Sequence, residues 1–220
     1  MEKLLHKFTK AYSTGNYSQI VSSYQKLKKY CKSKPDLKLI LKENPECKQF
    51  IFECKMIQNL IALMLDSKWS PVRAQESIFI ETQKQSDFFI KVQFKIDSSA
   101  ISVFSILFEI DLLQTWVDTL SSSTVLSESS MYRKKIRYRY KLPWPLSNRQ
   151  SILDLTCIPV PELNAVLLLL NTCQSSERSE EDINYIEMNL PCCGLWISSL
   201  EDHCEVTIYL QANQYIVMSQ

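Results

Sequence analysis

The feature that most restricts the fold is a segment of strict two-residue period between Tyr132 and Leu142. Alternate side chains of a strand point to opposite faces of a sheet. One face therefore carries mainly aromatic and aliphatic residues: Tyr132, Lys134, Ile136, Tyr138, Tyr140 and Leu142. The other face carries five cations: Arg133, Lys135, Arg137, Arg139 and Lys141. Because lysine and arginine are almost never buried without a partner, we expect a sheet that buries the tyrosine face and leaves the basic face in water.

This segment ends in a proline-bounded turn, Leu-Pro-Trp-Pro-Leu-Ser-Asn-Arg, over residues 142–149. A strand that leads into such a turn resembles the START domain, the lipid-binding module related to the steroidogenic acute regulatory protein. Three further segments are similar to the family's and follow in the family's order: Phe-Glu-Ile-Asp-Leu-Leu-Gln-Thr-Trp over residues 108–116, Cys-Gly-Leu-Trp-Ile over 193–197, and a strand over 204–211. The resemblance covers roughly residues 75–213.

The order of the periodic segments predicts an α+β fold. Residues 77–82 and 88–96 should form a hairpin, and Ser98 or Ser99 can cap a helix over 101–108 that leads on to 112–116. Strands are expected at about 126–142, 151–158, 164–171, 183–190, 195–200 and 204–212. This order matches the resemblance, which implies a curved antiparallel sheet gripping a helix, the START-like helix-grip fold.

The first 70 residues form a helical region before this domain. Apolar residues recur there at helical spacing, including Phe50, Cys54, Ile57 and Ile61. We expect residues 1–70 to be a helical extension and residues 71–220 a START-like lipid-binding domain. The resemblance implies a long closing helix after the last strand, and only a few residues follow that strand here. The C-terminal helix is therefore expected to be truncated or absent.

Composition argues against an enzyme. The chain has two glycines and two histidines, which leaves no glycine-rich phosphate loop and little acid and base chemistry. The only possible metal set is Cys192, Cys193, His203 and Cys204, whose adjacent cysteines lack the spacing usual at zinc sites. We expect no cofactor and no metal, and interpret the eight cysteines as apolar residues of a reducing compartment.

The resemblance implies a ligand cavity between sheet and helix. Its expected lining is Phe94, Trp116, Ile136, Tyr138, Tyr140 and Leu155, with Arg149 as a polar contact. Ordinary core packing explains an aromatic face equally well. Arg149 can instead pair with Asp154 or Asp111, although Gln150 stands where the family has an acid.

These features predict non-enzymatic binding, or transfer, of a lipid or other apolar ligand in a START-like cavity, with peripheral membrane contact. The alternative is a START-like scaffold subunit of a larger assembly with no exchangeable ligand. The sequence does not fix the lipid head group, because specificity depends on a few polar contacts.

The expected partners follow from the two faces of the strands. The basic face of Arg133, Lys135, Arg137, Arg139 and Lys141 suits water, an anionic membrane surface or an acidic protein. It does not suit nucleic acid, because the tyrosines lie on the opposite face and cannot interleave with the charges. The segment between Ala165 and Leu170 is apolar on both faces, so the amino-terminal helices or a partner chain should cover it.

The expected location is intracellular, in the cytoplasm or at the periphery of a membrane. No apolar run is long enough to cross a bilayer. The lysine-rich start leaves mitochondrial import as the alternative.

Overall fold

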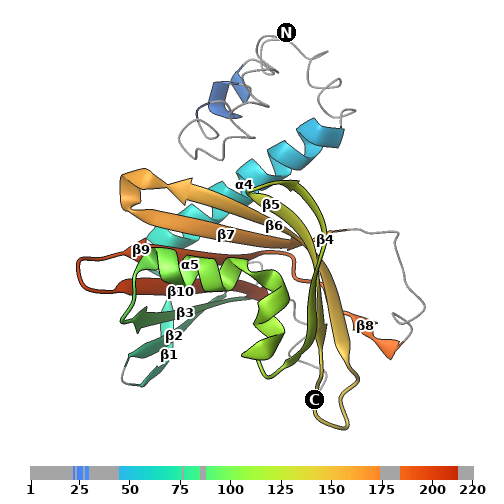
Figure 1. Ribbon diagram of the computed structural model, residues 1–220. Helices are drawn as coiled ribbons and strands as arrows, with labels where there is room; N and C mark the ends of the chain where they lie inside the picture. Colours follow the sequence, from blue (N-terminus) through green and yellow to red (C-terminus); the bar gives the residue numbers. More distant parts are fainter. Residues whose placement is uncertain are drawn as a thin grey trace. The chain divides into compact units, whose positions relative to one another are not determined.

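The computed structural model describes residues 22, 24–26, 28–29, 45–75, 77–84, 88–173 and 184–212 (Figure 1). The chain divides into two compact units, residues 1–67 together with Ile158–Val160, and the remainder. In the first unit, helix α4 spans Pro45–Leu65 and buries Cys54, Ile57 and Leu60. This confirms the predicted helix in that region, while most of the expected helical extension before residue 45 lies outside the described residues. The assignment of residues 1–70 and 71–220 as separate domains stays a prediction.

The second unit is built on one ten-stranded sheet. Its strands are β1 (Ser70–Gln75), β2 (Ile78–Lys84), β3 (Phe88–Ile96), β4 (Leu120–Ser130), β5 (Arg133–Tyr140), β6 (Arg149–Val160), β7 (Ala165–Thr172), β8 (Ile186–Glu187), β9 (Cys193–Ser199) and β10 (Cys204–Ala212). The spatial order is β1-β2-β3-β10-β9-β7-β6-β5-β4, and the short β8 pairs with β6 in parallel. Strand β10, late in the chain, therefore inserts beside β3 and joins the two halves of the sheet.

Helix α5 (Ala100–Phe108) and the 3-10 helix η1 (Ile110–Thr115) lie against one face of this sheet, which curves around α5 in Figure 1. We call this face the inner face; it carries Ile136, Leu153, Leu168 and Ile197. These residues form one buried cluster with Val103 of α5 and with Ile110 and Leu113 of η1. The predicted helix-grip arrangement is confirmed.

Ser99 begins α5, and this decides between the two serines proposed as its cap. The Ser99 Oγ accepts a hydrogen bond from the backbone N–H of Ser102 at 3.1 Å. Such a bond satisfies one of the unpaired donors of the first helical turn. The start of α5 is thus stabilised by a local side-chain contact.

The single strand expected at 126–142 is two strands, β4 and β5, joined by a tight turn at Met131 and Tyr132. The serine-rich β4 has no clear apolar alternation, which is why the sequence pattern missed its first half. It is an edge strand with three register shifts against β5, and such irregularities are common at sheet edges. Two more differences are the unpredicted β1 and the two-residue β8, where a strand over 183–190 was expected.

Strand β7 is buried on both of its faces. Leu167 and Leu169 point away from the inner face and are 1% and 0% exposed, while Leu168 and Leu170 belong to the inner cluster. A partner chain over this strand stays a prediction. Among the described residues, no helix combines the length and apolar character needed to span a membrane.

Candidate functional site

The inner face carries an apolar surface that the helices only partly cover. Seven inner-face side chains pack against the buried cluster yet keep some exposure: Phe94, Ile96, Tyr140, Val166, Leu195, Ile208 and Leu210. They come from β3, β5, β7, β9 and β10, and four of these strands lie in the middle of the sheet. Central positions would be fully buried under a close-packed layer, so this strip is the candidate binding surface.

Five of the predicted site residues belong to this region. Ile136, Tyr138 and Leu155 are 0%, 9% and 2% exposed within the cluster, and Phe94 and Tyr140 pack against it. The strand register brings them to one face, since Ile136 lies opposite Leu153 and Tyr138 opposite Ser151. Ile136 and Leu155 form the floor of the site, and Phe94 and Tyr140 lie at its accessible surface.

Trp116 does not join them. It follows the end of η1 and is 49% exposed, outside the buried cluster. The residues of η1 that turn toward the core are Ile110 and Leu113, which leaves the next positions toward water. The structure does not bring Trp116 into the cluster, and a role of its ring in ligand binding stays a prediction.

Arg149 begins β6 directly opposite Tyr140 of β5. Directly opposed residues of neighbouring strands share a face, so the guanidinium lies on the tyrosine side of the sheet. Its Nη1 is closed off from water and has no hydrogen-bond partner among the described residues. A buried donor without an acceptor is costly.

The carboxylates proposed to pair with Arg149 are engaged elsewhere. Asp111 Oδ1 accepts a hydrogen bond from the backbone N–H of Val125 at 3.2 Å. Asp154 interacts with Lys135 and with the Cys173 thiol, and its burial raises its pKa. Asp154 is five residues from Arg149 on the same strand, so it points to the opposite face.

Two tyrosines supply hydroxyl groups beside Arg149. The Tyr138 and Tyr140 rings lie edge to face with centroids 6.3 Å apart. Burial raises the pKa of both phenols well above its usual value, so both stay protonated at neutral pH. Each hydroxyl can therefore donate a hydrogen bond to an acceptor at this position.

Lys134 shares the tyrosine face and was not among the predicted site residues. Its ammonium lies 4.4 Å from the centroid of the Phe108 ring and 3.2 Å from Glu128 Oε1. The cation is thus held between α5 and the edge strand. Lys134 has an even number, as Tyr138 and Tyr140 do, and the two-residue period therefore placed it on the tyrosine face; this was the sequence signal that could have identified it.

Leu195, Ile208 and Leu210 were also missed, because nothing in their own strands marks one apolar position as more exposed than another.

The basic face is less exposed than its sequence pattern indicates. Arg133, Lys135, Arg137 and Arg139 are half-buried, and Lys141 alone of the five is exposed. The Arg139 guanidinium lies 5.0 Å from the Tyr185 ring, and Lys135 lies near Asp154 and Cys173. The expectation of five charges in water is wrong for these four, which are half-buried. Contact with an anionic membrane or an acidic protein through it stays a prediction.

The cysteines proposed as a weak metal set do not converge. Cys193 pairs with Leu210 and Cys204 with Ser199, so they lie six residues apart along the β9–β10 ladder. That separation is about 20 Å at roughly 3.3 Å per residue. Both are free thiols within the inner cluster. They serve as small apolar side chains there.

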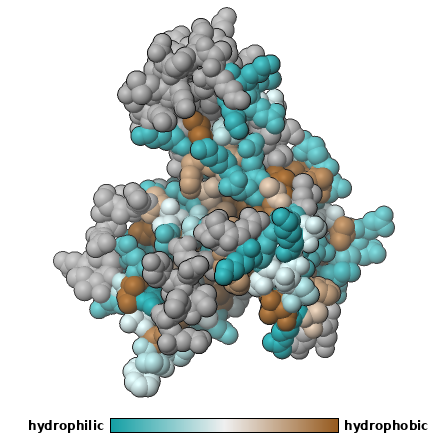
Figure 2. Space-filling model, turned by 180° about the vertical axis from the view of Figure 1, so that it is seen from behind, coloured by the Kyte–Doolittle hydropathy of each residue, from teal (hydrophilic) through white to brown (hydrophobic). Residues whose placement is uncertain are grey.

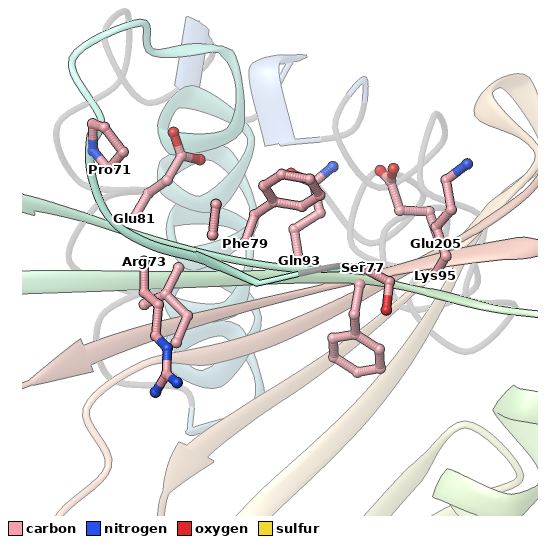
Figure 3. A pocket seen from close by; sticks show the side chains of 11 residues that line it. Pro71, Arg73, Ser77, Phe79, Glu81, Gln93, Lys95 and Glu205 are labelled. Atoms are coloured by element: carbon pink, nitrogen blue, oxygen red, sulfur yellow. The ribbon is translucent and has the colours of Figure 1, made fainter.

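A separate pocket of about 320 Å³ lies at the β1–β2 edge of the sheet (Figure 3). Figure 3 shows Glu81, Lys95 and Glu205 on one side of the strands and Arg73 on the other. Phe94 is the predicted site residue that lines it. Its charged lining distinguishes it from the inner-face strip.

Exposed apolar side chains also occur away from the inner strip. Trp144 in the proline-bounded turn is 93% exposed and Ile101 on α5 is 78% exposed. On the side of the molecule seen in Figure 2, hydrophobic residues form separate groups between hydrophilic ones. Scattered exposed apolar residues are normal on protein surfaces.

Comparison with solved structures places this architecture among START domains. Human STARD10 superimposes with a TM-score of 0.63 at 15% identity, over 71% of this chain and 65% of its own. Human StAR-related lipid transfer protein 5 gives 0.61 at 8% identity, over 75% and 85%. A StAR-related lipid transfer protein from Xanthomonas axonopodis gives 0.58 at 14% identity, over 67% and 83%.

The chain thus has a START-like fold and spans about two thirds of the human STARD10 chain. No family model and no curated protein sequence matches it. At such low identity, the likeness is one of fold. The resemblance expected from the turn over residues 143–149 is confirmed at that level.

Proposed function

We propose that this protein binds a lipid or another apolar ligand against the inner face of its sheet, without catalysing a reaction. The observation that carries the proposal is the partly exposed strip of Phe94, Ile96, Val166, Leu195, Ile208 and Leu210 in the middle of a large sheet. Two of the structural neighbours are described as lipid transfer proteins. The same fold around an apolar strip supports the same class of ligand here.

The strip provides enough driving force for useful affinity. Burying a methylene group contributes about 0.8 kcal/mol, so ten methylenes of a lipid chain would contribute roughly 8 kcal/mol before the costs of binding. The apolar side chains supply this term, and the polar groups at the Tyr140 end fix the orientation of the ligand. Such a combination is typical of ligand sites that hold rather than transform a molecule.

The decisive experiment is solvent extraction of the purified full-length chain, followed by mass spectrometry of the extract. A lipid at near one mole per mole of protein is the expected result. Addition of the neutral dye 1-aminoanthracene to delipidated protein should give enhanced fluorescence that added lipid displaces. Absence of both extracted lipid and dye binding would overturn the proposal.

The second candidate function is a scaffold subunit without an exchangeable ligand. Its supporting observation is the set of exposed apolar side chains outside the strip, with Trp144 and Ile101 the most exposed. Native mass measured across a range of concentrations separates the two candidates. A ligand-free chain found only in a larger assembly would favour the scaffold, and a lipid-loaded monomer would favour binding.

A further inference from the structure

The geometry points to a ligand with an anionic head, a carboxylate or phosphate joined to an apolar chain, whose head is bound by Arg149 and Tyr140. This inference rests on the proposed lipid-binding function and adds the chemical class of the ligand. The shared feature of the two head groups is a negatively charged oxygen acceptor.

The first step is the position of the two residues. Tyr140 and Arg149 end the β5–β6 ladder directly opposite each other, two residues along the strands from the pair of Tyr138 and Ser151. Tyr138 and Tyr140 are in edge contact. The guanidinium and the two phenols are therefore placed on the same face, at one end of the apolar inner face. A chain lying along the strip from β5 toward β10 would bring its head group to this end.

The second step is the missing acceptor. The Nη1 of Arg149 is buried without a partner in the described part of the chain. Asp111 bonds the backbone of Val125, and Asp154 lies on the opposite face. The next residue, Gln150, is an uncharged amide and points to the face opposite Arg149, so it supplies no compensating charge. Arg149 is partly exposed as a whole, but its buried Nη1 donor is unfavourable until an acceptor compensates it.

The third step concerns the tyrosine hydroxyls, which are hydrogen-bond donors that no group of the described residues already occupies. The Ser151 hydroxyl donates to the backbone oxygen of Met188 at 2.8 Å and is already used. Across the described residues, neither the Tyr138 nor the Tyr140 hydroxyl makes a hydrogen bond within the protein. Arginine binds carboxylate and phosphate through paired N–H groups. Neutral phenols beside it add donors without adding charge.

The test compares ligands with the same chains and different heads. Oleic acid is compared with oleyl alcohol, and dioleoyl phosphatidic acid with dioleoyl glycerol, each displacing 1-aminoanthracene from the full-length chain. The anionic member of at least one pair should bind at least tenfold more tightly. Which pair shows the preference distinguishes the carboxylate from the phosphate.

The variants assign this preference to the named residues. Arg149→Gln should remove the tenfold preference and leave the affinity for the neutral ligands unchanged. Arg137→Gln, on the other face of the neighbouring strand, is the matched control and should keep the preference. Tyr140→Phe keeps the ring packing, removes only the hydroxyl, and should reduce binding of the anionic ligand a few-fold. This second variant tests the inference independently if Arg149→Gln does not fold.

Three results would overturn the inference. The first is equal affinity of the wild-type chain for the charged and neutral members of both pairs, which would leave apolar ligand binding intact. The second is an equal loss of charged and neutral ligands in Arg149→Gln. The third is inorganic phosphate that competes as strongly as phosphatidic acid, which would indicate a site for a free anion. Failure of every ligand in the series would instead count against the proposed function itself.

Discussion

Gln114 of η1 and Ser123 of β4 hydrogen-bond each other twice. The Gln114 backbone N–H donates to Ser123 Oγ, and the Ser123 backbone N–H donates to Gln114 Oε1, both at 3.2 Å. With the bond from the Val125 N–H to Asp111, this contact satisfies backbone donors along an edge strand. Unpaired edge donors invite pairing with other chains, so η1 protects this end of the sheet.

Replacement of Gln114 by alanine should lower the free energy of unfolding by about 1–3 kcal/mol, because one hydrogen bond is lost and the partly buried N–H of Ser123 is left without an acceptor. Urea unfolding of the full-length chain measures the change. Ser127→Ala, an exposed serine on the same strand, is the control and should change stability by less than about 0.5 kcal/mol. Equal effects of the two substitutions would mean that the reciprocal bonds do not hold η1 to β4.

The capping bond of α5 gives a second prediction. Ser99→Ala should reduce stability by about 1 kcal/mol, since the Ser102 N–H loses its acceptor. Ser98→Ala removes a hydroxyl from the adjacent position and should be close to neutral. Thermal unfolding followed by circular dichroism compares them. A larger loss for Ser98→Ala would contradict the assignment of Ser99 as the cap.

The inner strip gives a third prediction. Ile208 is a partly buried residue of β10 on the inner face, so Ile208→Trp should fill space that the proposed ligand needs and weaken lipid binding at least tenfold. Lys95→Trp places the same ring on the opposite face of β3, at an exposed position, and should leave binding unchanged. Displacement of 1-aminoanthracene measures both. Unchanged affinity in Ile208→Trp would place the ligand elsewhere.

Alkaline pH should destabilise the protein. Burial raises the pKa of Cys157 and of Cys193 from 9.0 to about 12. A group whose pKa is higher in the folded state stabilises that state below its unfolded pKa, and this contribution is lost as pH rises toward the folded value.

Each of these thiols should therefore lower the free energy of unfolding by about 1.4 kcal/mol per pH unit above pH 9. Urea unfolding under reducing conditions at pH 8, 9 and 10 gives the slope, and Cys193→Ala should reduce it. A stability that stays constant between pH 9 and 10 would show that these thiols are accessible to water.

The sequence pattern was sufficient to predict strands and their faces where apolar and polar residues alternate strictly. Ile136, Tyr138 and Tyr140 lie on one face of β5 as the two-residue period requires, and the hairpin of β2 with β3 follows from the same rule. The turn over residues 143–149 pointed to the START-like fold, and the solved structures support it. The pattern failed for β4, where serines replace the apolar residues that would mark its buried positions.

The candidate site was only partly predictable for a different reason. Exposure depends on what packs above a residue, and Trp116 and Ile208 are both apolar in sequence. The end of η1 leaves Trp116 facing water, whereas incomplete cover over β10 leaves Ile208 at the surface of the strip. Arg139 and Lys135 likewise are half-buried beside residues distant in sequence, Tyr185 and Cys173.

By itself, the amino-acid sequence determined which side chains share a face, because the pleat of a strand assigns alternate residues to opposite sides whatever surrounds it. It also fixed the scarcity of glycine and histidine, with two of each, which is too few glycines for a glycine-rich phosphate loop. Only the tertiary structure decided that Arg149 lies opposite Tyr140 while its proposed acidic partners are held elsewhere. Pairing between strands distant in sequence and the packing of helices across them set those relationships, and no local pattern encodes them.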